Sequence, residues 1–146
     1  MLWVLHAVAV MVGVILALQV GVNAQLQRAI ASPFMVSFVS FVVGSLGLGC
    51  VVMVVRAPIP GATLAQVPWW CWLGGLLGAL HVTLSLALAP KIGGAALFAA
   101  IVCGQMISAL TFDHLGAFGL AQHPVTLVRL LGVALVLAGM LLIQRT

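Results

Sequence analysis

The sequence predicts an all-α integral membrane protein with five transmembrane helices per subunit. Of its 146 residues, 65% are hydrophobic and only 4% are charged, whereas a soluble domain carries about 25% charged residues. The mean hydropathy is +1.38. Such a chain cannot cover a water-facing surface with polar groups, so we expect a lipid bilayer to be its solvent. Five apolar runs follow one another along the chain, each close to the ~20 residues that span hydrocarbon.

The apolar runs predict a single transmembrane domain over residues 1–146, with helices at about 2–24, 33–55, 68–88, 93–115 and 126–143. Ser32 can cap the second helix, and Pro33 suits its first turn. Residues 89–94 form a tight break between the third and fourth helices, and Gly116 is typical of a helix C-terminus. Spanning strands would be about half as long and would alternate in polarity, so helices are favoured.

The basic residues stand singly where apolar runs end, as membrane topology signals do. An odd number of helices puts the termini on opposite sides of the membrane; we name the side of the N-terminus side A and the other side B. Side B then holds Arg28, Lys91 and Arg145, and side A holds Arg56 and Arg129. This near-balance indicates a chain that inserts both ways and pairs antiparallel, or else an accident of a short chain. No basic patch suits nucleic acid.

Small residues recur at helical spacing in the predicted helices. In the fourth helix they make a ridge, which we name the small-residue ridge: Ala96, Ala100, Gly104 and Ser108. In the third helix, Gly74 and Gly78 share one face. Lipid gives no hydrophobic drive for helix association, so small residues allow the close contacts that replace it. They fit packing within the monomer or between subunits, and the small-residue ridge is our candidate for a subunit interface.

Four polar side chains are predicted to border one central cavity and to bind substrate: Gln19, Asn23, His81 and Gln105. At ~1.5 Å per residue, His81 and Gln105 lie roughly 18 Å from an end of their helices, near the bilayer midplane. Polar groups at that depth are costly and often functional. The alternatives are a hydrogen bond to a neighbouring helix for His81 and Gln105, and interfacial solvation for Gln19 and Asn23.

Asp113 is the only acidic residue of the chain. It comes near the end of the fourth helix on side A, and Arg129 opens the fifth helix on the same side. We expect a structural salt bridge or hydrogen bond between them that clamps the connecting loop, because a proton-coupling carboxylate would be better placed near the midplane. His6, His114 and His123 also fall on side A, but with Asp113 they match no metal-ligand spacing, so we expect no metal.

Motifs of enzyme chemistry are absent from the sequence. It has no Ser-His-Asp order, carboxylate pair, Walker loop or dinucleotide fingerprint. We therefore expect no catalytic activity and no cofactor.

Four segments, taken in order, resemble the YdcZ family, the five-helix branch of the drug/metabolite transporter superfamily. They are LQVGVNAQLQRAIASPFMVSFVSFVVGSLGL (18–48), PWWCWLGGLLGALHV (68–82), GQMISALTFDHLGAFGL (104–120) and LVRLLGVALVLAGMLLI (127–143). The resemblance covers nearly the whole chain. The positions that match the family's motifs are Gln19, Asn23, Gly44, Gly74, Gly75, Gly78, Gly104, Gln105, Asp113, Gly116 and Arg129. His81 departs from the pattern, since an aromatic residue, usually Tyr, is expected there.

The resemblance implies a multi-pass, transporter-like protein of the bacterial inner membrane. It also implies a dual-topology homodimer, or a heterodimer of oppositely inserted paralogues, matching the halves of the superfamily's ten-helix transporters. The related four-helix multidrug exporters carry a glutamate in their first helix. This chain has none, so the resemblance does not extend proton antiport by that route.

The function that we expect is secondary transport of a small metabolite or organic solute by an antiparallel dimer that works by alternating access. Inverted repeats around a midplane site are the usual architecture of such transporters. The alternatives are a non-transporting membrane scaffold or assembly protein, and one half of a heterodimeric transporter. A polar cavity at the midplane would favour transport, and a solidly packed dimer would favour the scaffold.

Overall fold

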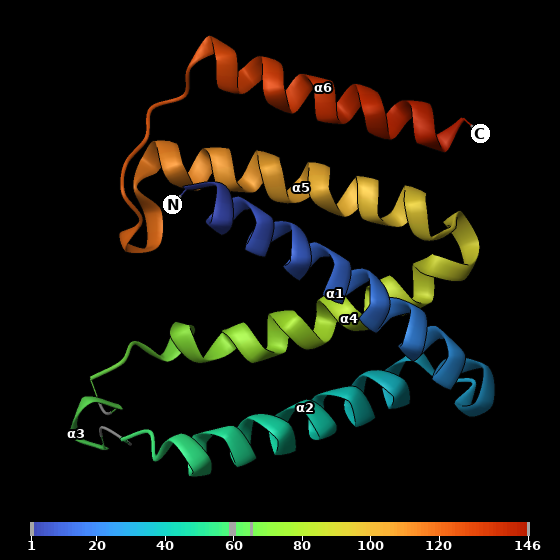
Figure 1. Ribbon diagram of the computed structural model, residues 1–146, viewed down its shortest axis with the longest axis vertical. Helices are drawn as coiled ribbons and strands as arrows, with labels where there is room; N and C mark the ends of the chain where they lie inside the picture. The colour runs from blue at the N-terminus through green and yellow to red at the C-terminus, as the bar shows by residue number, and fades with distance from the viewer. Residues whose placement is uncertain (1, 59–60, 65, 146) are drawn as a thin grey trace. The chain divides into compact units, whose positions relative to one another are not determined.

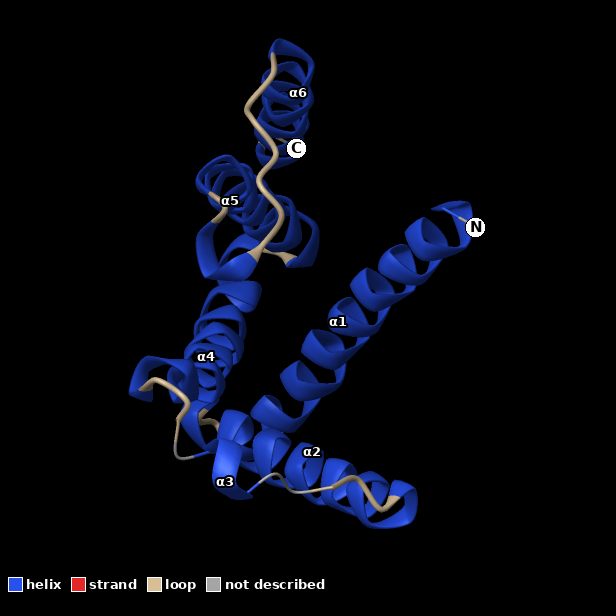
Figure 2. Cartoon of the chain, turned by 90° about the vertical axis from the view of Figure 1, so that its left-hand side faces the viewer, coloured by secondary structure: helices blue, strands red, loops and turns tan. Residues whose placement is uncertain are grey.

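A computed structural model describes residues 2–58, 61–64 and 66–145, and within these ranges the chain forms helices and loops without a strand (Figures 1 and 2). Five helical segments are long and apolar enough to cross a membrane, which confirms the predicted class. The elements are α1 (Leu2–Ile30), α2 (Pro33–Val55), α3 (Gly61–Leu64), the 3₁₀ turn η1 (Trp69–Leu73), α4 (Gly74–Ile92), α5 (Gly94–Leu115), the 3₁₀ turn η2 (Ala117–Gly119) and α6 (Leu127–Gln144).

The first helix runs further than the apolar run predicts, to Ile30 instead of about residue 24. Its last two turns hold Gln, Leu and Arg, which are good helix formers, so nothing in the sequence stops the helix there. The stop comes at Ala31, whose φ of 57° is left-handed, just before Ser32 and Pro33. Ser32, the residue before Pro33, is extended, because a residue in that position is disfavoured in the α region. The corner between α1 and α2 therefore lies at Ala31 and Ser32.

The helix starts follow the expected capping chemistry. The Ser32 hydroxyl accepts a hydrogen bond from the Met35 amide at 3.3 Å at the start of α2. The Thr126 hydroxyl accepts one from the Arg129 amide at 3.3 Å at the start of α6. Each cap satisfies an amide that has no partner inside its helix.

The third spanning segment is not one uniform helix. It begins with η1 and continues as α4 through Pro90 to Ile92, so the break before α5 narrows to Gly93. Pro90 lies in the last turn of α4; it has no amide to donate to the Leu86 carbonyl, and its ring crowds that carbonyl, so the helix ends two residues later at Ile92. Gly93 has a φ of 81°, a conformation that glycine adopts without steric cost.

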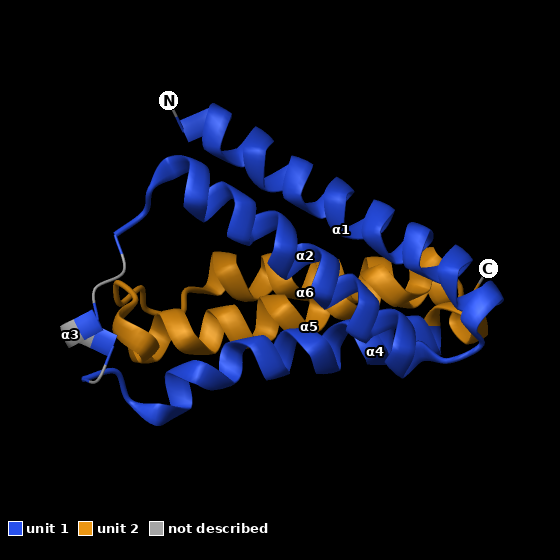
Figure 3. Ribbon diagram, turned by 90° about the horizontal axis from the view of Figure 1, so that it is seen from below, with its two compact units in different colours: residues 1–88 blue, residues 89–146 orange. Residues whose placement is uncertain are grey.

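The chain divides into two compact units, residues 1–88 and 89–146 (Figure 3). The first unit has an apolar cluster of Val36, Val82 and Leu86, with Leu26, Ile30 and Phe41 packed against it. The far end of α1 thus contributes two residues to this cluster, which explains why α1 continues past the predicted end. In this unit α1, α2 and α4 meet near the corner between α1 and α2.

The second unit is built on the antiparallel pair of α5 and α6, joined by η2 and an extended loop (Figure 1). Cys103 on α5 is buried, and its thiol lies 3.6 Å from the Val136 carbonyl oxygen of α6. Gly116 ends α5 in a left-handed conformation with a φ of 60°. The sequence predicts a glycine in this role at a helix C-terminus.

Candidate functional site

Of the four predicted site residues, Asn23 is the one that is buried, and it lies in the first unit. Only 6% of its surface is exposed, and its side-chain amide donates a hydrogen bond to the Ser40 hydroxyl at 3.2 Å. This bond joins α1 to α2 inside the spanning region. Asn23 is therefore held in a fixed orientation, which a residue that recognises a substrate needs as much as a structural residue does.

A second polar contact joins α2 to α4 in the same unit. The Thr83 hydroxyl lies 2.9 Å from the Ser37 hydroxyl and 2.8 Å from the Ala79 carbonyl oxygen. The Ser37 hydroxyl in turn donates to the Pro33 carbonyl at 2.8 Å. Ser37 is buried, so the three helices of this unit are connected by hydroxyl and amide groups as well as by apolar packing.

The other three predicted site residues, Gln19, His81 and Gln105, are exposed. Gln19 lies one turn before Asn23 on α1, His81 lies on α4 of the first unit, and Gln105 lies on α5 of the second unit. Their side chains make no hydrogen bond within the described part of the chain. Three of the long apolar helices, α1, α4 and α5, thus each carry an exposed polar side chain that has no hydrogen-bond partner in the described part of the chain. That these residues border one cavity stays a prediction.

The predicted packing glycines of α4 have different surroundings. A Cβ on Gly78 would lie 3.3 Å from Cζ of Phe41, tighter than ordinary contact, so Gly78 lets α2 approach α4. Gly74 has open space around it. Gly78 thus fits packing within the monomer, one of the two roles that the sequence left open for it.

The small-residue ridge lies on another side of α5 than the hollows that α5 shares with α6. The α5 residues that line hollows shared with α6 include Ala95, Ala99, Val102 and Met106, and at 100° per residue this stripe lies roughly 150° round the helix from the ridge. Gly104 and Ser108 are exposed, and Ala96 and Ala100 are half-buried. The hollows therefore do not account for the ridge, although Ala96 shares a face of α5 with Cys103, which contacts Val136 of α6.

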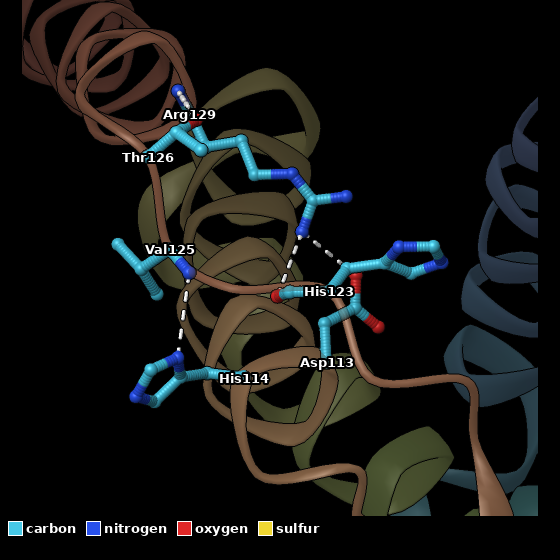
Figure 4. A network of polar contacts seen from close by, with 6 residues as sticks. All are labelled: Asp113, His114, His123, Val125, Thr126 and Arg129. Atoms are coloured by element: carbon cyan, nitrogen blue, oxygen red, sulfur yellow. Dashed lines mark hydrogen bonds and ion pairs between the residues drawn. The ribbon is translucent and has the colours of Figure 1, made fainter.

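Asp113 and Arg129 form an ion pair that links the end of α5 to the start of α6 (Figure 4). Arg129 Nη1 lies 3.3 Å from Asp113 Oδ2 and 3.4 Å from the His123 carbonyl oxygen. The contact uses one nitrogen and one carboxylate oxygen, and it is longer than the ~2.7–2.9 Å of a strong charged hydrogen bond. Both side chains are about one-third exposed, at 34% and 38%.

Backbone and side-chain contacts around this pair hold the loop between α5 and α6. The His123 amide donates to the Asp113 carbonyl at 2.8 Å. His114 Nδ1 accepts from the Val125 amide at 3.3 Å (Figure 4), and the His114 carbonyl accepts from the Gln122 side chain at 2.9 Å. Asp113 and His114 thus hold the segment from Gln122 to Val125 against the end of α5. The ion pair is one contact among several.

Sequence reasoning missed several of these residues. Ser37 and Ser40 stand among the small residues of α2, and only the neighbouring helices reveal that their hydroxyls bind Thr83 and Asn23. The sequence analysis considered His114 only in a set of side A residues that matches no metal-ligand spacing, and it did not predict the contacts of His114 in the loop. Within residues 2–58, 61–64 and 66–145, no three His, Cys or Asp side chains gather into a group that could hold a metal.

Within the described residues, five helical segments are long and apolar enough to span a membrane, and they define the class, a multi-pass membrane protein. Over residues 4–142 the chain matches the family described as “Putative inner membrane exporter, YdcZ”, and it belongs to that family. It is thus a multi-pass protein of the inner membrane, in a family of transporters rather than enzymes. No curated protein and no solved structure matches the chain.

Proposed function

We propose that the protein is a secondary transporter that moves a small metabolite or organic solute across the bacterial inner membrane, as an antiparallel dimer working by alternating access. Gln19, Asn23, His81 and Gln105 would border the substrate path. Family membership supports export in general, and the dimer, the path and the class of substrate are inferences from the residues.

The observation that carries the proposal is the set of exposed, unsatisfied polar side chains on the spanning helices. Gln105 lies about 16 Å from the first residue of α5 and about 15 Å from its last, at ~1.5 Å per residue. An amide or imidazole left without a partner in hydrocarbon costs several kcal/mol (~2–7). Gln19, His81 and Gln105 therefore need a watery cavity or a second subunit, and a transport path between subunits provides both.

Antiparallel pairing supplies the inverted repeat that alternating access uses. One subunit has five spanning helices, and a second subunit inserted the other way presents the same helices in the opposite direction. The same polar residues then occur on both sides of the path. Two conformations, one open to each side and related by a twofold axis in the membrane plane, follow from this symmetry.

A flux screen in proteoliposomes tests the proposal. The purified protein would be reconstituted and assayed with a panel of labelled organic cations, amines, amino acids and sugars, with empty liposomes as the baseline. We expect saturable flux for one class. Gln105→Leu should abolish that flux while the dimer stays intact, and Ile107→Leu, a matched change at an exposed apolar position of α5, should leave it unchanged.

The screen also distinguishes the alternatives. Flux that appears only when a paralogue is added identifies one half of a heterodimeric transporter. A dimer that carries no member of the panel, and in which Gln105→Leu changes only the pull-down of other membrane proteins, identifies a scaffold and contradicts the proposal.

A further inference from the structure

A groove runs along one side of the α5–α6 pair, within the second unit. Two hollows of about 330 Å³ and 450 Å³ lie in line along it. On α5 their lining residues recur at spacings of three and four, which is one face of a helix. The residues that follow this spacing are Ala95, Ala99, Val102, Met106, Ala109 and Asp113, and Phe98 and Leu110 line the hollows beside them. From the first to the last the groove is ~27 Å long at ~1.5 Å per residue.

The α6 side of the groove is lined in part by glycine. Gly132 lines the larger hollow and Gly139 the smaller one. A Cβ built on either glycine would meet nothing within 4 Å. The groove is therefore not filled by side chains of this unit, and its wall is almost wholly apolar apart from one end.

That end holds the Asp113–Arg129 ion pair, which lines the larger hollow. The pair uses only Asp113 Oδ2 and Arg129 Nη1. In the described part of the chain, Asp113 Oδ1 and Arg129 Nη2 make no further bond. A ligand in the groove can therefore reach an anionic acceptor and a cationic donor side by side, at the membrane boundary where α5 ends and α6 begins.

We propose that this groove binds a zwitterionic phospholipid with a primary ammonium headgroup, with the lipid phosphate on Arg129, its ammonium on Asp113 and an acyl chain along Met106, Ala109 and Gly132. Charge complementarity selects this occupant. An anionic lipid would bring its charge against the Asp113 carboxylate, and a cationic amphiphile would meet the Arg129 guanidinium. A headgroup that carries both signs matches both.

The shape of the groove supports a lipid over a helix of a second copy. The groove is charged at one end and apolar at the other, as one lipid molecule is. A helix laid along it would cover the part-exposed Asp113–Arg129 ion pair. The free energy lost by removing these charges from water exceeds the free energy gained from their single 3.3 Å contact. The inference goes beyond transport and does not depend on it.

Native mass spectrometry of the full-length protein tests the headgroup. After delipidation, the protein would be titrated with phosphatidylethanolamine, phosphatidylglycerol and diacylglycerol of the same acyl chains. We expect phosphatidylethanolamine to bind about tenfold more tightly than either of the others, and Asp113→Asn to reduce that preference about tenfold, as the loss of a charge-assisted hydrogen bond does. Equal binding of the three lipids would overturn the proposal.

A second variant tests the groove without touching the ion pair. Gly132→Leu places a side chain in the open space of the groove and should weaken phosphatidylethanolamine binding about tenfold. Ala134→Leu changes the outer face of α6 and should leave it as in the parent. A photo-crosslinking side chain at Ala109 should attach to lipid; attachment to a second copy of the chain, or equal lipid binding by the two α6 variants, would overturn the proposal.

Discussion

The side-chain amide of Asn23 donates to the Ser40 hydroxyl at 3.2 Å and ties α1 to α2 within the membrane-spanning region. In hydrocarbon neither group has water as a partner, so each depends on the other. Double-mutant cycles on comparable bonds between membrane helices average about 0.6 kcal/mol, with a maximum near 1.7 kcal/mol. The contact that the structure gives Asn23 is therefore a structural one between α1 and α2.

The first prediction is that Asn23 and Ser40 are energetically coupled. Asn23→Ala and Ser40→Ala should each lower thermal stability in detergent, and the double variant should cost less than the sum, by about 0.6 kcal/mol. Ser45→Ala, at an exposed position of α2, serves as the control and should have little effect. Strict additivity of the two changes would show that the bond does not form in the membrane protein.

The second prediction concerns Asp113 as a structural clamp. Asp113→Asn should lower thermal stability or expression, by at most about 1 kcal/mol because the pair is part-exposed and long, and it should leave the pH dependence of transport unchanged. The backbone contacts of Asp113 and His114 would still hold the loop. Loss of proton coupling in a well-folded Asp113→Asn protein would make this carboxylate mechanistic instead.

The third prediction is that Gly116 cannot be replaced without strain. Its φ is 60°, and a Cβ there would lie 3.5 Å from the Gln122 Cβ. A left-handed conformation costs a residue with a side chain roughly 1–2 kcal/mol, so Gly116→Ala should lower the melting temperature measurably. Gly49→Ala, in the interior of α2 with open space around it, should be neutral or stabilising. Equal melting temperatures would show that the loop can rearrange.

The class of the fold could be predicted from sequence because it depends on composition and run length, both of which are local. Local rules also predicted the Ser32 cap and Gly116. They failed at the end of α1, where hydropathy falls after Ala24 but Leu26 and Ile30 pack on Val36 and Leu86. The length of the apolar run alone therefore gives the wrong end, whereas the helix formers after Ala24 and the stop before Pro33 agree with the observed one.

The polar contacts between helices are harder to predict from sequence than the helix ends. Ser37 and Thr83 are 46 positions apart in the chain, and nothing at either position indicates the other. Asp113 and Arg129, by contrast, are 16 positions apart across one helix connection, so their proximity could be expected. Whether Gln19, His81 and Gln105 share a cavity depends on contacts between the two units and between subunits. Neither the helical periodicity of the sequence nor the structure of one chain defines those contacts.

The fourth prediction is that the small-residue ridge forms a subunit contact. The ridge lies outside the hollows between α5 and α6, and Gly104 and Ser108 are exposed. Gly104→Leu should raise the monomer fraction in detergent because a large side chain keeps two backbones apart. Ala134→Leu on α6 is the matched control, since it adds a similar side chain at an exposed position outside the ridge. An unchanged dimer in both variants would assign the ridge to packing within one subunit.

The last prediction is the dual topology of the dimer. Side B carries Arg28, Lys91 and Arg145 and side A carries Arg56 and Arg129, and so slight a difference sets orientation weakly. Two lysines added beside the N-terminus should make side A cytoplasmic in most copies. Removing Arg56 and Arg129 should favour the opposite orientation.

Reporters fused to the C-terminus, one active in the cytoplasm and one in the periplasm, measure both outcomes in cells. In the unaltered protein we expect both reporters to be active, because each orientation is populated. The two charge variants control for each other. If the balance of positive charge sets the topology, the added lysines and the removal of Arg56 and Arg129 must shift the orientation in opposite directions. If the unaltered chain shows one orientation and does not respond, and if no oppositely inserted paralogue pairs with it, an antiparallel dimer is impossible. A parallel dimer or a monomer would then have to replace it, and the inverted repeat on which alternating access rests here would be lost.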